Sequence, residues 1–170
     1  MKEARCRPCK TSGLGWPTRN ETMVIFSAIK LKELFEKKRD YPWQKPQSCP
    51  CCNSNRLWGP GFADAIFDGY NQPLLLKLYR CPECSCVIRL RPEGYFKRFQ
   101  APVETIRSSI VCKSTKNRWL AGISRSRQCH WFGALEKKIR AYLTDTWSQG
   151  IVAGFDYFLQ RNQLPVSRSI

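Results

Sequence analysis

The chain has 170 residues, of which 42% are hydrophobic and 12% aromatic, a composition that excludes global disorder. Its 29 Lys and Arg outnumber 13 Asp and Glu, so the formal net charge is +16 and a polyanion is the expected partner. No stretch approaches the ~20 consecutive apolar residues of a membrane-spanning helix, so we expect no membrane partner. Ten cysteines without a secretory signal favour metal binding in a cytoplasmic protein over a disulfide framework.

The start of the chain is expected to be a leader followed by a helix and a linker. Residues 1–22 lack sustained periodicity, so we expect them to be disordered, and Met23 is a candidate alternative start of translation. Over residues 24–38 apolar side chains recur every three or four positions among charged ones, which predicts an amphipathic helix. Residues 40–47 contain two prolines and predict a linker, so helix and linker together occupy residues 23–47.

Two Cys-x2-Cys pairs, each with proline after its first cysteine, follow the linker. Two tight turns that carry four thiolates are the donor set of a structural zinc ion, and four thiolates leave the metal no open position for catalysis. We therefore predict one structural Zn²⁺ bound by Cys49, Cys52, Cys81 and Cys84. Cys51 and Cys86 lie beside the pairs and are alternative ligands.

The other cysteines are assigned simpler roles. Cys6 and Cys9 have the same spacing as the predicted ligands but fall in the leader, where we expect free thiols. Cys112 and Cys129 fall within helical patterns and are predicted to be small core residues.

Three strands are predicted around the cysteine pairs. Residues 62–70 and 74–80 are rich in aromatic and branched side chains and are separated by Asn-Gln-Pro, which predicts two strands joined by a turn. Residues 86–91 alternate apolar and basic side chains and predict a third strand. The sequence therefore predicts a small three-stranded zinc ribbon over residues 48–95, whose folding free energy comes largely from the metal.

The periodicity becomes helical after Ala101. We predict a helix over residues 102–113, a short helix over residues 117–121 that ends at Gly122, and a longer third helix that begins at Ser124 or Ser126. The third helix has apolar residues at spacings of three and four, namely Cys129, Phe132, Leu135, Ile139 and Leu143. Residues 100–144 thus match the helix-turn-helix plan, and the whole chain is predicted to be α+β.

A last helix is predicted within a C-terminal helix and tail over residues 145–170. Asp145 can cap it, and apolar residues from Trp147 to Leu159 share one side. Gly150 and Gly154 each weaken this prediction by roughly 1 kcal/mol relative to alanine unless close packing requires them.

The segment 122–131, Gly-Ile-Ser-Arg-Ser-Arg-Gln-Cys-His-Trp, resembles the turn and recognition-helix start of many bacterial regulators and transposase N-terminal regions. The order of the two cysteine pairs, an apolar strand, Tyr95-Phe96 and helices resembles a family of small bacterial proteins linked to mobile elements, across roughly residues 45–143. In that family a zinc ribbon precedes a helix-turn-helix. The resemblance implies a nucleoid-associated DNA-binding protein with a separate transposase as a candidate partner.

The resemblance also indicates which side chains contact nucleic acid. Exposed positions at the start of the third helix would face bases, and Arg can pair with guanine while Gln can pair with adenine. The predicted nucleic-acid contacts are Arg125, Arg127, Gln128 and His130 for bases, Lys116 and Arg118 for phosphates, and Lys137 and Lys138 on the other faces of the third helix.

Two departures from the family pattern affect these predictions. Asn53 and Ser85 follow the cysteine pairs where glycine is usual, which leaves the zinc prediction intact. Gln128 or Cys129 stands where a branched apolar residue commonly packs the recognition helix, which makes the register of the third helix ambiguous by about one residue.

Three functions are consistent with these patterns. The favoured one is a zinc-dependent, sequence-specific DNA-binding protein, either a regulator or an end-binding accessory or remnant of a transposition system. The second is an RNA-binding zinc ribbon that stacks bases on Trp58, Phe62, Phe67 and Tyr70. The third is a truncated fragment of a transposase, although the scattered aspartates form no acidic constellation, so we expect no enzymatic activity in this chain.

Overall fold

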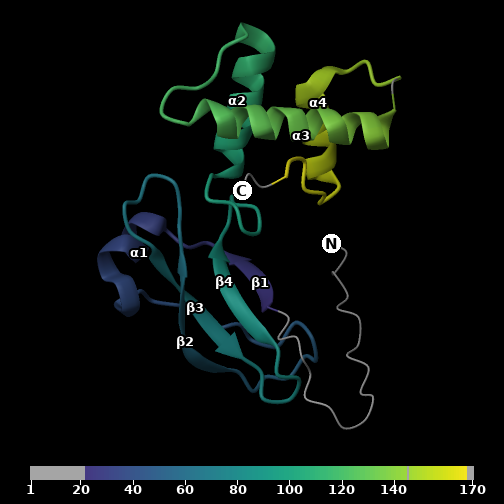
Figure 1. The fold of residues 1–170 in the computed structure, drawn as a ribbon. Helices are drawn as coiled ribbons and strands as arrows, with labels where there is room; N and C mark the ends of the chain where they lie inside the picture. Colours follow the sequence, from purple (N-terminus) through teal and green to yellow (C-terminus); the bar gives the residue numbers. More distant parts are fainter. Residues whose placement is uncertain (1–21, 145, 168–170) are drawn as a thin grey trace. The chain divides into compact units, whose positions relative to one another are not determined.

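The computed structural model describes residues 22–144 and 146–167, and the chain divides into two compact units between Glu93 and Gly94 (Figure 1). The first unit contains a four-stranded sheet and a short helix, and the second contains three helices, so the fold is α+β as predicted. Most of the predicted leader, with Cys6 and Cys9, lies outside the described residues, as does Asp145. No helix in the described part of the chain is long and apolar enough to cross a membrane.

The first unit is built on a mixed sheet with the strand order β1-β4-β3-β2. Strands β2 (Trp58–Ala65), β3 (Leu74–Arg80) and β4 (Val87–Pro92) are antiparallel neighbours, and β1 (Thr22–Ser27) pairs in parallel with β4. β4 is an inner strand, and its Ile88 and Leu90 are almost fully buried. Burial of these alternating apolar side chains stabilises the unit from within.

The helix predicted over residues 24–38 is wrong in its first half. Residues 22–27 form β1, and only α1 (Leu31–Lys37) and a short 3-10 turn, η1 (Lys38–Asp40), are helical. A short run of Thr, Met, Val, Ile and Phe fits a helix or a strand equally well by spacing, and its branched side chains favour a strand once an edge is available. The free edge of β4 supplies that partner, so the predicted three-stranded ribbon has a fourth strand.

The predicted ribbon strands agree with the structure to different degrees. Residues 74–80 form β3 as predicted, and β4 begins one residue later than predicted. The other strand was predicted at 62–70 but occupies Trp58–Ala65, with an irregular register between Trp58 and Gly61. Residues 66–70 were predicted to continue this strand but lie outside it. The ring of Tyr70, the last of them, contacts the ring of Phe35 in α1.

The second unit is a bundle of three helices, α2 (Val103–Lys116), α3 (Arg125–Leu143) and α4 (Gly150–Gln160), each of which contacts the other two. Its core mixes aromatic and aliphatic residues, with Trp131, Phe155 and Phe158 each at most 1% exposed. Arg107 of α2 donates two hydrogen bonds of 2.8 Å to Asp156 of α4, one to each carboxylate oxygen. This bidentate pair fixes α2 against α4 at the margin of the core.

The short helix predicted over residues 117–121 is wrong, because residues 117–124 form a loop. Asn117 ends α2 in a left-handed conformation with φ 51°, a position where asparagine is tolerated better than most residues. The third predicted helix is confirmed as α3, preceded by Ser124, although the Ser124 side chain makes no capping hydrogen bond. The compact helix-turn-helix of the prediction is thus replaced by two helices joined by a loop.

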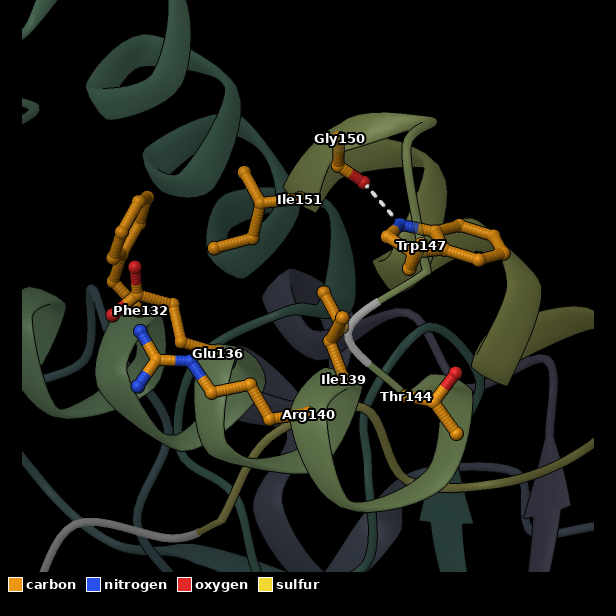
Figure 2. A pocket seen from close by; sticks show the side chains of 8 residues that line it. All are labelled: Phe132, Glu136, Ile139, Arg140, Thr144, Trp147, Gly150 and Ile151. Atoms are coloured by element: carbon orange, nitrogen blue, oxygen red, sulfur yellow. Dashed lines mark hydrogen bonds between the residues drawn. The ribbon is translucent and has the colours of Figure 1, made fainter.

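An open groove of about 380 Å³ lies between α3 and α4 (Figure 2). Ile139 and Ile151 lie within it, and the Trp147 indole N–H donates a 2.9 Å hydrogen bond to the Gly150 carbonyl at its edge. A Cβ at the buried Gly154 of α4 would collide with the Ile139 side chain of α3, so a larger residue there would force Ile139 to move. The other lining residues are Phe132, Glu136, Arg140 and Thr144.

Candidate metal centre and basic surface of the helical unit

The two Cys-x2-Cys pairs occupy equivalent tight turns of the first unit. One turn precedes β2 and the other joins β3 to β4. In each turn the backbone N–H of the first cysteine donates to the carbonyl five residues later, from Cys49 to Ser54 (2.9 Å) and from Cys81 to Cys86 (3.0 Å). Local backbone geometry therefore presents both pairs in the same manner.

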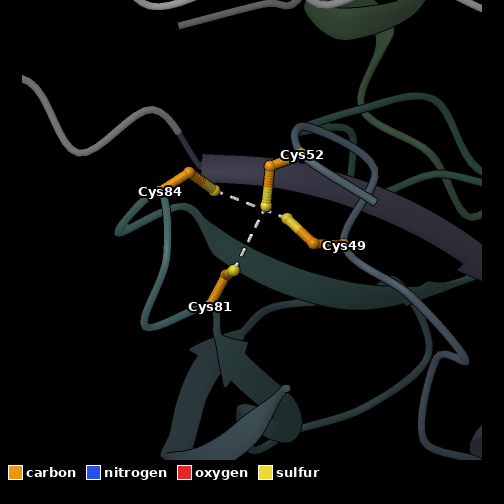
Figure 3. A group of neighbouring side chains, drawn as sticks. All are labelled: Cys49, Cys52, Cys81 and Cys84. Carbon is orange, nitrogen blue, oxygen red and sulfur yellow. Dashed lines mark hydrogen bonds between the residues drawn. The ribbon is translucent and has the colours of Figure 1, made fainter. Parts of the chain in front are cut away.

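The four predicted ligands converge on one point (Figure 3). Their Sγ atoms all lie within 4.8 Å of one another, with 3.5 Å between Cys49 and Cys84 and 3.5 Å between Cys52 and Cys81. A tetrahedral metal with sulfur at ~2.3 Å requires sulfur–sulfur edges of about 3.8 Å, close to these spacings. The four side chains, which come from both turns, are therefore arranged to hold a metal ion.

The surroundings of the four thiols favour ionisation of Cys81 over that of Cys84. Burial raises the pKa of this thiol, but the Cys84 backbone N–H, the Cys52 thiol and the Glu83 backbone N–H outweigh that effect and lower the pKa to about 7. Burial raises the pKa of Cys84 instead. Without a cation the first thiolate thus suppresses ionisation of its neighbours, whereas a bound cation would stabilise all four thiolates together.

The residues after the two pairs adopt the conformation that glycine usually supplies. Asn53 has φ 59° and Ser85 has φ 58°, both in the left-handed region. Glycine would adopt this backbone conformation without strain. Asn53 and Ser85 adopt it at the cost of local strain, because each has a Cβ atom.

Gln128 is not available to contact bases, and the prediction for this residue is corrected. Its side chain is 1% exposed. The amide oxygen accepts from the Ser109 hydroxyl (2.7 Å) and the Leu120 N–H (2.9 Å), and the amide nitrogen donates to the carbonyls of Leu120 (3.0 Å) and Ile123 (2.9 Å). All four hydrogen-bonding positions of the amide are used, so Gln128 fastens the 117–124 loop to α2 and α3.

The burial of Gln128 also settles the register of α3. Gln128, Trp131, Leu135 and Ile139 are the buried residues of this helix, whereas Cys129 is exposed. The prediction that Cys129 is a core residue is wrong: in the first turns of α3 the buried positions are Gln128 and Trp131, one residue before the predicted Cys129 and Phe132, whereas Leu135 and Ile139 are buried as predicted. Cys112 is half-buried in α2.

Two other predicted nucleic-acid contacts are engaged with the C-terminal segment. The His130 Nε2 lies 3.0 Å from the Ser167 hydroxyl, and the Lys138 ammonium donates to the Leu164 carbonyl. Lys138 also lies 4.6 Å from the centre of the Phe158 ring, and burial lowers the pKa of Lys138. These contacts give both side chains a role in holding residues 164–167 against α3.

The remaining predicted contacts are distributed over two parts of the helical unit. Lys116, Arg118 and Arg125 are exposed at the end of α2, in the loop and at the start of α3. Arg127, half-buried in the next turn, stacks over the Trp131 ring at 4.9 Å, and Lys137 is exposed farther along α3.

One basic residue of this surface was not predicted from the sequence. The Lys113 ammonium lies 5.0 Å from the centre of the Trp119 ring and donates to the Asn117 side-chain oxygen. Lys113 lies four residues before Asn117, and residues at this spacing share one face of a helix. This spacing could have predicted that Lys113 lies beside the start of the loop.

The four aromatic residues predicted to stack on bases do not form an exposed surface. Phe67 is 1% exposed beneath Arg91, while Phe62 contacts Trp43 and lies under Lys77. Tyr70, as noted above, contacts α1. Of the four predicted stacking residues only Trp58, at 52% exposure, presents its ring to solvent, so the stacking prediction is corrected.

Comparison with known proteins adds no relative to this picture: no family model, no curated protein and no solved structure matches the chain. The resemblance to zinc-ribbon proteins of mobile elements therefore remains a prediction from the residues quoted above.

Proposed function

We propose that the chain is a zinc-dependent DNA-binding protein whose contacts come from the 117–124 loop and the start of α3. The observation that carries the proposal is the exposure of Arg118 on a loop that Gln128 holds in one conformation, with Lys116 and Arg125 exposed at the helix ends that flank this loop. A fixed loop removes the entropic cost of ordering the backbone on binding and leaves only that of the side chains.

Charge distribution supports a polyanionic partner for the helical unit. Residues 94–170 contain 13 Lys and Arg against 4 Asp and Glu, a larger excess than in the longer first part of the chain. One of those acids, Asp156, is already paired with Arg107. The phosphates of a nucleic acid would therefore encounter a positive electrostatic potential around the loop. The N-terminus of α3, at Arg125, adds the positive end of the helix dipole.

The proposed role of the metal is structural. Four thiolates suit Zn²⁺ and would fill its coordination sphere, so the ion would contribute folding free energy rather than a reactive water. Metal analysis of the protein purified without added metal tests this part: we expect zinc as the bound element. Recovery of iron with a visible chromophore instead would overturn the assignment of zinc.

Duplex DNA is favoured over RNA because the stacking surface that the RNA function requires is reduced to Trp58. Anisotropy titrations with duplex DNA and single-stranded RNA of equal length, each over a range of salt, test the choice. We expect tighter binding to the duplex and a linear fall of log affinity with log salt, about −0.9 per phosphate neutralised. Tighter binding to RNA, or a flat salt dependence, would contradict the proposal.

A triple variant locates the interface. Replacing Lys116, Arg118 and Arg125 by Ala should reduce the magnitude of the salt slope by about 2.7, because three phosphate contacts are lost. The matched control replaces the exposed Lys97, Arg98 and Arg140, which removes the same charge from other parts of the helical unit. Equal losses in the two triple variants would show that only net charge matters and would remove the loop from the interface.

The same proposal covers two biological roles, a regulator and a protein that binds the ends of a transposable element. Selection of sites from fragmented genomic DNA, with competitor DNA at about 0.15 M salt, distinguishes them. Sites upstream of genes support the regulator, and repeated element ends support the transposition role together with a separate transposase as partner.

A further inference from the structure

Two further cysteines lie against the four-cysteine site. Cys51 and Cys86 place their Sγ atoms 3.3 Å apart, and both sulfurs lie within 4.8 Å of the Cys49 sulfur. Cys86 is 8% exposed and Cys51 is half-buried. The first unit therefore brings six cysteine side chains into one region, in two groups that have Cys49 in common.

The two additional thiols do not follow from the symmetry of the turns. Counted from the first cysteine of each turn, Cys51 occupies the place of Glu83, and Cys86 occupies the place of Ser54. A turn of this type thus needs cysteine at neither position, and the two that are present come from non-equivalent places. They nevertheless meet across the gap between the turns, where Cys51 Sγ contacts Cys86 Sγ.

We infer that Cys49, Cys51 and Cys86 form a second metal site, which binds a thiophilic cation and shares the Cys49 sulfur with the first. Thiolates are soft donors that select Zn²⁺ and Cu⁺, and three of them around one cation need sulfur–sulfur spacings of about 4 Å. The Cys51 and Cys86 sulfurs are 3.3 Å apart and both lie within 4.8 Å of the Cys49 sulfur, so a small separation of Cys51 from Cys86 would admit the cation. A thiolate sulfur has lone pairs for two cations, so Cys49 would bridge the ions of a two-metal cluster.

The local charge is compatible with such a cluster. Six thiolates and two divalent ions carry a net charge of −2, the same as one divalent ion in the four-cysteine site alone. The chain around the cluster has a formal net charge of +16, which lowers the cost of this anionic centre. The inference rests on the proposed first zinc site, because the bridging sulfur belongs to both.

Native mass spectrometry of the full chain, reduced and then saturated with Zn²⁺ or with Cu⁺ in separate samples, counts the ions directly. We expect two bound ions in at least one of the two samples. The variants Cys51→Ser and Cys86→Ser should each bind one ion fewer and retain the first, which also shows that the unit is still folded. The matched control, Cys129→Ser, alters an exposed cysteine of the helical unit and should keep the full count.

A second measurement needs no variant. Saturation with ¹¹³Cd should give two cadmium NMR resonances, each split by coupling through the shared Cys49 sulfur. One resonance and one bound ion with every metal would overturn the second site and leave the first intact, and two resonances without coupling would overturn the bridge. Failure to bind any ion would instead refute the four-cysteine site of the proposed function.

Discussion

The two units of this chain organise their interiors in different ways. In the first, the buried cluster contains Cys49, Cys81 and Cys86 together with aliphatic residues and Tyr79, so metal-ligating side chains are also core side chains. In the second, the core consists of apolar residues from three helices and from the segments beside them, and the buried Gln128 side chain is fully hydrogen-bonded within the unit. We therefore predict that the first unit needs a bound metal to stabilise its interior, whereas the helical unit folds without a ligand.

The largest expected effect tests the dependence of the first unit on metal. Cys81 is fully buried, and Cys81→Ser should remove a metal contribution of roughly 10 kcal/mol, so the sheet should lose protection from hydrogen exchange. The helical unit should keep its protection in the same sample. Cys112→Ser, which alters a half-buried thiol of α2, is the control. A Cys81→Ser protein that retains metal and a protected sheet would refute the predicted dependence of the first unit on metal.

The second prediction tests whether the helical unit depends on its buried amide. Gln128→Ala leaves the Ser109 hydroxyl, the Leu120 amide and two carbonyls without their partner, which should cost about 3 kcal/mol in the free energy of unfolding. Urea denaturation measures the loss, and hydrogen exchange should increase first in the 117–124 loop. The exposed neighbour Cys129→Ala should change stability by less than about 0.5 kcal/mol. Similar effects of both substitutions would contradict the role of the amide.

A smaller effect is expected from the ion pair of the helical unit. The hydrogen bonds from Arg107 lower the pKa of Asp156 below its usual value, against the opposing effect of burial. The pair therefore stabilises the fold above the unfolded pKa of about 4, and this contribution is lost as the pH falls through the folded pKa. Asp156→Asn should cost about 1 kcal/mol at pH 7, since both side chains are about a third exposed. The difference from the parent protein should shrink as the pH falls below about 4 and through the folded pKa, and a constant difference would exclude the ion pair as its cause.

The smallest expected effect is a gain in stability. Ser85→Gly relieves the left-handed conformation at φ 58° and should stabilise the metal-bound first unit by about 0.5–1 kcal/mol. The midpoint of thermal unfolding in zinc-saturated protein measures the gain. Ser54→Gly, in the other cysteine turn and at a position whose φ is not in that region, should destabilise the unit. A loss of stability in both variants would show that the Ser85 conformation carries no strain.

The metal centre could be predicted from the sequence because its information is local. Two residues of spacing define each turn, and one hairpin suffices to bring the turns together, so the four predicted ligands form one cluster that could hold a metal ion. The contact between Cys51 and Cys86 was not predictable, because it depends on how one turn approaches the other. Strand β1 was missed for a similar reason, since its conformation is decided by a partner strand far along the chain.

The surface of the helical unit was predicted less well because polar residues do not reveal their burial. The pattern placed Cys129 inside α3 and Gln128 outside, whereas the four partners that bury Gln128 come from α2 and from a loop that was predicted to be a helix. The same uncertainty affects Lys138, whose ammonium contacts the C-terminal segment. The periodicity of the sequence therefore predicts that a helix is present. Which of its faces is exposed can be predicted only when the neighbouring elements are known.

The parallel pairing of β1 with β4 also sets an order of events while the chain is being made. Thr22 pairs with Val87, 65 positions later, so at ~5–20 residues per second β1 is synthesised about 3–13 s before its partner. All four ligand cysteines and the β2–β3 hairpin are completed within that interval. β1 therefore stays without its partner strand until all four cysteines of the proposed metal site have been synthesised.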